Sequence, residues 1–138
     1  MFSPTSETKR LARVWFDEVI NKHNLGALDE FYAADYIYHN EDGSVTTGRD
    51  FAKQVATRLI ESVPDRVATV HEQIAEGDRV ATRWSSKGTH TGIPILGREP
   101  NGDVVEAWGL VISRIEDGRV AEDWELVRVD FRGGPQSG

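Results

Sequence analysis

Residues 104–129, VVEAWGLVISRIEDGRVAEDWELVRV, form two runs of β-branched and aromatic side chains on either side of the triplet EDG. Such runs are typical of β-strands, and the sequence Glu-Asp-Gly is typical of a tight turn. Two strands that a tight turn joins pair in the antiparallel sense. The sequence therefore predicts a hairpin with strands at Val104–Ile115 and Arg119–Val129.

The same pattern occurs a second time upstream. Val67–Ala75 and Arg79–Lys87 flank the triplet EGD, which predicts another antiparallel hairpin. Residues 88–103, GTHTGIPILGREPNGD, are rich in Gly and Pro and are expected to form a longer connection between the two hairpins. We therefore expect a meander of four antiparallel strands after Pro64.

Before Pro64 the apolar residues recur at the spacing of helices. This spacing extends over Ser6–Asn24, and a second, short helix is expected over Leu25–Ala33. The segment DYIYHNEDGS, residues 35–44, is expected to be a loop because it contains Gly and Asn. A third helix, apolar at every fourth position from Phe51 to Leu59, should end at Pro64. Helices followed by a meander, with no βαβ pattern, predict the α+β class.

Length and composition limit the classes of protein to consider. The 138 residues suit one domain, which we place at 1–132, with a loose tail, GGPQSG, at 133–138. A formal charge of −7 disfavours nucleic acid as a partner because it repels polyphosphate. The absence of cysteine fits a reducing compartment, so we expect the cytoplasm. The opening residues, MFSPTSETKR, lack the apolar run of a signal peptide, and no stretch is long enough to span a membrane.

The sequence contains none of the motifs that hold a cofactor or a metal. It has no phosphate-binding glycine loop, no nucleophile elbow and no dinucleotide fingerprint. The four histidines, His23, His39, His71 and His90, lie far apart in the chain, without the close spacing of a zinc site. We therefore expect neither a cofactor nor a metal.

The densest group of titratable residues is AEDWEL, residues 121–126, in which Glu122, Asp123 and Glu125 surround Trp124. Carboxylates are uncommon inside strands, and one that faces an enclosed space would have a raised pKa and exchange protons near neutral pH. Because side chains alternate along a strand, Asp123 and Glu125 should share a face, where their like charges raise the pKa of one of them. The residue types alone favour a simpler interpretation, in which these acids lie at a solvated strand end.

The two faces of this strand also bear on the assembly. Alternation puts Val127 on the same face as the two acids and Trp124, Leu126 and Arg128 on the other, so neither face is cleanly polar. Mixed faces predict a sheet that is covered on both sides. We expect helices to cover one side and a second copy of the chain, in a homodimer, to cover the other.

Further candidates for a site lie on two predicted segments. His39 follows Tyr36 and Tyr38, a group able to exchange protons at the entrance of a pocket, although a loop histidine bonded to backbone fits equally well. Arg83 should lie on the face opposite to Trp84. There it is a candidate to pair with a carboxylate or to stabilise an oxyanion, and a plain salt bridge is the commoner outcome.

Three more residues are expected to bind a ligand. His90, in the flexible segment GTHTG, is placed to close over a bound molecule or else is merely exposed. Trp108 fits an apolar filler whose indole N–H needs a partner, and Trp15 lies on the apolar face of the first helix. Both tryptophans are therefore included among the residues that line the expected pocket.

The whole pattern resembles the SnoaL-like polyketide cyclases, a branch of the nuclear-transport-factor-2-like superfamily. The resemblance covers nearly the entire chain and lies in the first amphipathic helix and in the segments DYIYHN, IAEGDRVATRWSSKGTHTG, GREPNG and VISRIEDGRVAEDWELVRVD. It implies a cone-shaped fold, in which N-terminal helices pack on a curved antiparallel sheet and enclose a pocket for a hydrophobic small molecule.

The resemblance also implies a chemistry. Members of the family close a ring by aldol chemistry without cofactor or metal, and Glu125 matches the carboxylate that serves them as general acid/base. The histidine that assists them falls near Val111, which cannot transfer protons, so Tyr38 or His39 would replace it while Asp123 modulates Glu125. A cofactor-free cyclase or isomerase is the implied function. A non-catalytic binding protein and an epoxide hydrolase with an arginine–carboxylate relay stay open as alternatives.

Overall fold

A computed structural model describes residues 4–133 of the chain. Six strands form one curved sheet in the order β2-β1-β6-β5-β4-β3. The strands are β1 (Tyr32–His39), β2 (Val45–Thr47), β3 (Val67–Glu76), β4 (Arg79–Thr89), β5 (Val104–Glu116) and β6 (Arg119–Arg132). The α+β class and the four predicted strands after Pro64 are confirmed, and β3 to β6 form the predicted antiparallel meander.

The hairpin that the sequence predicts most directly is built as expected. Glu116 pairs with Arg119, and the two residues between them, Asp117 and Gly118, have φ values of 52° and 74°. Positive φ at both central residues is the geometry of the two-residue turn that matches the twist of paired strands. The turn sets the first pairs of the hairpin, and a shift of register between Arg114 and Ile115 then brings Val111 opposite Glu125.

One segment differs from the prediction. Tyr32–His39, most of which was expected to be loop, is strand β1, and it pairs with β6 in the parallel sense, so the sheet is mixed. The Asn and Gly that indicated a loop belong to the turn after it, where the Asn40 N–H donates to the carbonyl of Ser44. Val45–Thr47 then returns as β2, antiparallel to β1.

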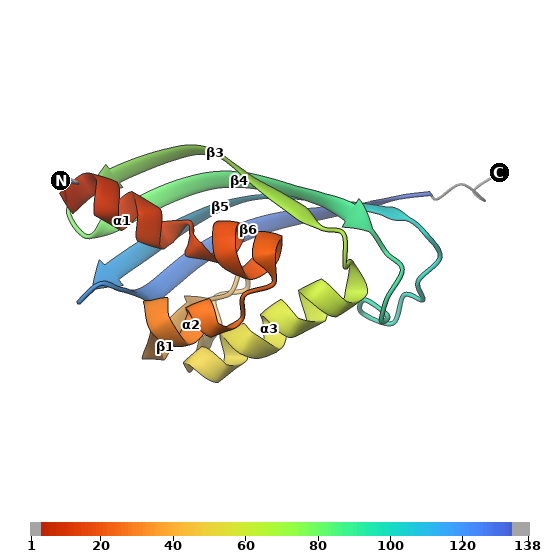
Figure 1. Ribbon diagram of the computed structural model, residues 1–138, viewed down its shortest axis with the longest axis horizontal. Helices are drawn as coiled ribbons and strands as arrows, with labels where there is room; N and C mark the ends of the chain where they lie inside the picture. Colours follow the sequence, from red (N-terminus) through yellow and green to blue (C-terminus); the bar gives the residue numbers. More distant parts are fainter. Residues whose placement is uncertain (1–3, 134–138) are drawn as a thin grey trace.

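The helices lie on one side of the sheet (Figure 1). They are α1 (Pro4–Ala12), the π-helical segment η1 (Trp15–Ile20), α2 (Gly26–Phe31) and α3 (Arg49–Ser62). The single helix expected over Ser6–Asn24 is therefore divided, while α3 ends before Pro64 as predicted. A π-helical turn widens the backbone and rotates the side chains that follow, a feature often found at functional sites. Here it carries Trp15, Phe16 and Ile20, which all line the cavity described below.

The core lies between the helices and the inner face of the sheet. Burial alternates along β4, where Val80, Thr82, Trp84 and Ser86 are buried. Gly109 on β5 pairs with Trp84, and a Cβ atom added at Gly109 would lie 2.4 Å from a ring carbon of that tryptophan. Only glycine leaves room for the indole at this position, so Gly109 determines where Trp84 lies.

Of the helices within residues 4–133, none is long and apolar enough to cross a membrane. The tail expected at 133–138 lies outside the described residues from position 134 onward.

Candidate functional site

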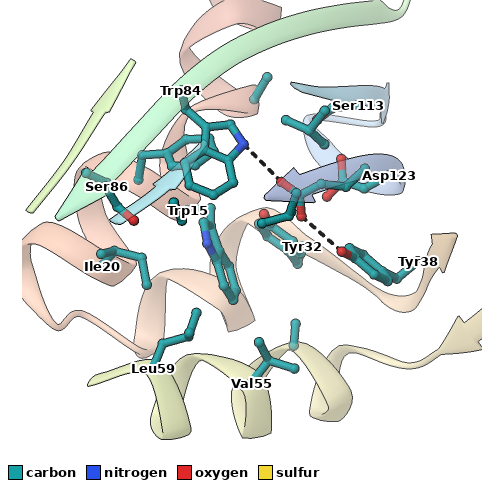
Figure 2. A pocket seen from close by; sticks show the side chains of 18 of the residues that line it. Trp15, Ile20, Tyr32, Tyr38, Val55, Leu59, Trp84, Ser86, Ser113 and Asp123 are labelled. Atoms are coloured by element: carbon teal, nitrogen blue, oxygen red, sulfur yellow. Dashed lines mark hydrogen bonds between the residues drawn. The ribbon is translucent and has the colours of Figure 1, made fainter. Parts of the chain in front are cut away.

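A cavity of about 350 Å³ lies between the helices and the inner face of the sheet. Its wall is largely apolar, and seven aromatic side chains contribute to it: Trp15, Phe16, Tyr32, Tyr36, Tyr38, Phe51 and Trp84. Two carboxyl groups, those of Asp123 and Glu125, also face it (Figure 2). An apolar cavity with a few convergent polar groups is the usual form of a small-molecule site.

Glu125 is held by two neutral donors. The Tyr38 hydroxyl donates to its Oε1 at 3.0 Å and the Trp84 indole N–H donates to its Oε2 at 3.0 Å, the two dashed lines of Figure 2. Burial and the nearby Asp123 raise the pKa of Glu125 from 4.5 to about 7, although the two hydrogen bonds oppose that rise. A carboxyl group with such a pKa can both accept and release a proton at neutral pH.

Asp123 lies on the same face, two residues before Glu125, and is 6% exposed. The Tyr36 hydroxyl donates to its Oδ2 at 2.6 Å, whereas its Oδ1 accepts no hydrogen bond from the part of the chain described. Burial raises the pKa of Asp123 from 3.8 to about 6, against the opposing effect of the Ser113 and Tyr36 hydroxyls. The two carboxyls interact, so they titrate as a pair rather than independently.

The tyrosines beside these acids stay protonated. Burial and the neighbouring carboxylates raise the pKa of Tyr36 and Tyr38 well above the ordinary value of 10.0. Tyr32, whose ring centroid lies 4.9 Å from that of Tyr36, has a raised pKa for the same reasons. These hydroxyls therefore act as hydrogen-bond donors across the range in which the carboxyls titrate.

His39 lies away from the cavity, on the opposite face of the sheet. Its Nε2 is 2.6 Å from Oε2 of Glu122, and its ring stacks on Trp124 with centroids 4.7 Å apart. The cause is the alternation of a strand, which turns Tyr36 and Tyr38 inward and His39 outward. The structure therefore does not bring His39 to Glu125.

Three other predicted residues also lie elsewhere. Arg83 and Trp108 are on the outer face of the sheet, where Arg83 pairs with Glu72 at 3.3 Å and Trp108 is 40% exposed. His90 is fully buried in the connection between β4 and β5, with Nε2 2.8 Å from the carbonyl oxygen of Ile93. The arginine–carboxylate relay of an epoxide hydrolase is therefore not assembled around Glu125.

The remaining predicted residues do meet at the cavity, which Trp15, Tyr36, Tyr38 and Val111 line together with the two acids. Sequence reasoning missed Tyr32, Ser113 and Arg66, which line it too. Alternation accounts for Tyr36 and Tyr38 but not for Tyr32, because the register of β1 is irregular between Tyr32 and Ile37.

No group of three or more His, Asp or Glu residues suited to a metal ion is found within residues 4–133. The polar groups of the cavity itself are two carboxyls, hydroxyls, two indoles, an amide and one guanidinium. This set supports proton transfer and hydrogen bonding to a ligand.

Comparison with known proteins gives a consistent result. The model of the family described as SnoaL-like polyketide cyclase matches residues 10–129. IdmH, a candidate polyketide cyclase from Streptomyces antibioticus, is 29% identical, with 87% of this chain and 91% of that chain aligned and a TM-score of 0.73. Among curated protein sequences, none matches the chain.

Two further structures share the fold at lower identity. A candidate SnoaL-like polyketide cyclase from Jannaschia sp. CCS1 is 22% identical over 92% of this chain and 90% of that chain, with a TM-score of 0.80. A candidate ketosteroid isomerase from Kribbella flavida is 20% identical over 95% of this chain and 84% of that chain, with a TM-score of 0.66. The same fold therefore serves proteins described as cyclases and as isomerases.

Proposed function

This chain belongs to the SnoaL-like polyketide cyclase family, and from that premise we propose that it is a cofactor-free cyclase or isomerase with Glu125 as its general acid/base. Its substrate is a small hydrophobic molecule with an acidic C–H beside a carbonyl group, of the polyketide type. One observation carries the proposal: a carboxyl group with a pKa raised to about 7 faces an otherwise largely apolar cavity.

The proposed reaction begins with the ionised form of Glu125. Its carboxylate takes a proton from a carbon next to a substrate carbonyl and leaves an enolate. In a cyclase the enolate carbon attacks a second carbonyl, so that a carbon–carbon bond forms and the resulting alkoxide takes the proton back from Glu125. In an isomerase the same proton returns to a different carbon. Positioned proton transfer of this kind typically contributes about 10² to 10⁴-fold in rate.

The neighbours of Glu125 have supporting roles in this proposal. Tyr38 donates to the Glu125 carboxylate, and once that carboxylate takes a proton the hydroxyl is free to donate to the substrate oxygen instead. Asp123 keeps the pKa of Glu125 high through its negative charge. Val111, opposite Glu125 on β5, contributes an apolar wall and no second proton donor.

A non-catalytic binding protein is the second candidate, and two observations favour it. Both carboxylate oxygens of Glu125 already accept hydrogen bonds, as they would in a purely structural role. The assisting histidine that the family resemblance implies also falls near Val111, which cannot transfer protons. In this alternative a bound molecule is released unchanged, and substitution of Glu125 alters affinity rather than rate.

The two candidates differ in a test that does not need the natural substrate. Methyl naphthyl ketone in deuterated buffer reports enolate formation, because its methyl protons exchange for deuterium and increase its mass. We expect wild-type protein to accelerate the exchange and Glu125→Gln to lose about 10²-fold of that acceleration. The matched control is Glu72→Gln, on the outer face of the sheet. Equal acceleration by wild type and Glu125→Gln would overturn the acid/base assignment.

We also propose that the outer face of the sheet is covered by a second copy of the chain. Trp108, Leu110, Ile112 and Leu126 are 40%, 55%, 45% and 63% exposed on neighbouring strands of this face. A contiguous apolar surface of this kind usually marks an interface. The lack of cysteine keeps the cytoplasm as the proposed location.

A further inference from the structure

One charged side chain of the cavity has no partner in the described structure. Arg66 lies between α3 and β3 and lines the cavity, and its Nε is buried without a hydrogen bond. No ion pair to its guanidinium is formed by any of residues 4–133. Burial lowers the pKa of Arg66, which nevertheless stays protonated because an arginine is charged at any ordinary pH. A buried polar group without a partner costs free energy, so it calls for an explanation.

The carboxylate of Asp65 attracts the Arg66 guanidinium through its charge but forms no hydrogen bond or ion pair with it. Asp65 precedes Arg66 in the chain, but its Oδ1 accepts the Thr89 N–H at 2.7 Å and its Oδ2 accepts the Thr89 hydroxyl at 2.9 Å. These two hydrogen bonds tie Asp65 to the end of β4 and lower its pKa. Asp65 therefore acts as an anchor for the backbone, and the guanidinium of Arg66 is left facing the cavity.

The backbone around Arg66 is closely fitted. The Arg66 N–H donates to the carbonyl of Val63 at 3.1 Å, which closes a turn around Pro64. A Cβ atom added at Gly88 would lie 2.3 Å from the Val63 side chain and 2.9 Å from Cα of Arg66. Because only glycine permits this contact, β4 presses directly against the turn and fixes the point from which the Arg66 side chain starts.

Arg66 stands at the end of the cavity away from the two acids. It lies two residues before Ala68, and register places Ala68, Ser86, Ala107 and Val129 in one row across the sheet. All four line the cavity. The β6 member of this row is Val129, which lies four residues after Glu125, or about 13 Å along the strand. Figure 2 shows Ser86 and Ile20 at the opposite end of the view from Asp123 and Tyr38.

The cavity therefore has two poles of opposite charge, with apolar and aromatic side chains between them. The acids would repel an anionic group at one end, while the unpaired guanidinium would attract it at the other. The Ser86 hydroxyl, in the row next to Arg66, offers a second hydrogen bond to the same group.

From this arrangement we propose that Arg66 binds an anionic oxygen of the ligand, a carboxylate being the simplest case. The ligand is then an elongated hydrophobic acid whose acidic group lies on the order of 10 Å from the carbon that faces Glu125. Arg66 is a specificity-determining residue that selects acids over neutral esters and sets the direction in which the molecule enters. Which end of the ligand reacts rests on the proposed function. The preference of the cavity for an anionic ligand does not.

The test compares two probes that share one apolar skeleton, naphthylhexanoic acid, which is anionic at neutral pH, and its neutral methyl ester. Their dissociation constants are measured by fluorescence and calorimetry at neutral pH for wild type, Arg66→Met and Arg66→Lys. Arg83→Met, which removes an arginine from the outer face, is the matched control. A charge-assisted hydrogen bond in a buried site corresponds to about a tenfold to hundredfold change in affinity.

We expect wild type and Arg83→Met to bind the acid at least about tenfold more tightly than the ester. Arg66→Met should lose this preference through weaker binding of the acid alone, and Arg66→Lys should keep part of it. Equal affinities in wild type, no measurable binding of the acid, or a preference that survives in Arg66→Met would each overturn the proposal. If Arg66→Met does not fold, equal affinities of wild type for the acid and the ester would still overturn the proposal, and Arg66→Lys would still test the role of Arg66. If wild type showed no deuterium exchange that depends on Glu125, the proposed function would be overturned. The preference of the cavity for the acid over the ester would not be affected.

Discussion

Replacing Glu125 with Gln should make the protein more stable at alkaline pH than the wild type. The pKa of this group is 4.5 in its ordinary state and about 7 in the folded protein. As pH rises between those values, the unfolded chain releases the proton while the folded chain retains it. Stability therefore falls as pH rises, and the full penalty is present above the folded pKa. A difference of 2.5 pKa units corresponds to at most about 3 kcal/mol.

The neutral amide of Gln cannot ionise, so Glu125→Gln removes this penalty. Its carbonyl accepts one of the two hydrogen bonds made to Glu125, and the Tyr38 hydroxyl can turn to accept from its amide. Urea unfolding at steps between about pH 5 and about pH 8 measures the effect. We expect the variant to gain up to about 3 kcal/mol on the wild type across that range.

The difference between the two proteins isolates Glu125, together with its effect on the coupled Asp123, from the other titrating groups. Glu72→Gln, at an exposed glutamate, should follow the wild-type curve. If the curves of Glu125→Gln and wild type ran parallel over the whole range, the pKa of Glu125 would be the same in the folded and unfolded states. The reasoning from burial to raised pKa would then be refuted.

Three further predictions concern the surroundings of the site. Gly109→Ala should displace the Trp84 indole, break its hydrogen bond to Glu125 and cost about 1–3 kcal/mol, measured by urea unfolding with tryptophan fluorescence; unchanged stability and fluorescence would contradict this. Tyr38→Phe removes a donor that lowers the pKa of Glu125, so that pKa should rise, and NMR titration showing a fall would count against the assigned hydrogen bond. Leu126→Glu should convert a dimer into a 15.4 kDa monomer in light scattering, whereas a wild type that is already monomeric would disprove the proposed interface.

Strand alternation is the part of the site that the sequence predicts well. Once the last strand is identified from its β-branched residues and its Gly turn, period two places Asp123, Glu125 and Val127 on one face. The structure has all three lining the cavity. The same rule places Arg83 and Trp84 on opposite faces, as found. Local pattern was sufficient here because residues 123–127 and residues 83–84 each lie in an uninterrupted stretch of strand, where alternation alone decides the face.

Strand β1 could not be predicted in this way. Its longer ladder is formed with β6, a parallel partner far along the chain, which leaves no local signal. The turn after β1 leads only to β2, a strand of three residues. Asp35 and the Asn40–Gly43 turn indicate a loop locally, and long-range pairing overrides that tendency. The error at His39 follows directly, because a residue assigned to a loop has no alternation by which to place its side chain.

Arg66 was missed for a different reason. It lies in a short segment between Pro64 and the first meander strand, where neither helical nor strand periodicity applies. Its position depends on contacts with Val63 and Gly88 and on the hydrogen bonds between Asp65 and Thr89. Such tertiary contacts leave no periodic trace in a sequence.

The central claim is that Glu125 holds a proton near neutral pH inside the cavity, and NMR titration of protein labelled with carbon-13 at the glutamate carboxyls tests it most directly. The account predicts one carboxyl resonance with an apparent pKa of about 7, absent from the spectrum of Glu125→Gln. A Glu125 resonance that titrates near the ordinary value of 4.5 would contradict the account, because the cavity would then not have raised the pKa of this carboxylate, which would be too weak a base to take a proton from carbon effectively.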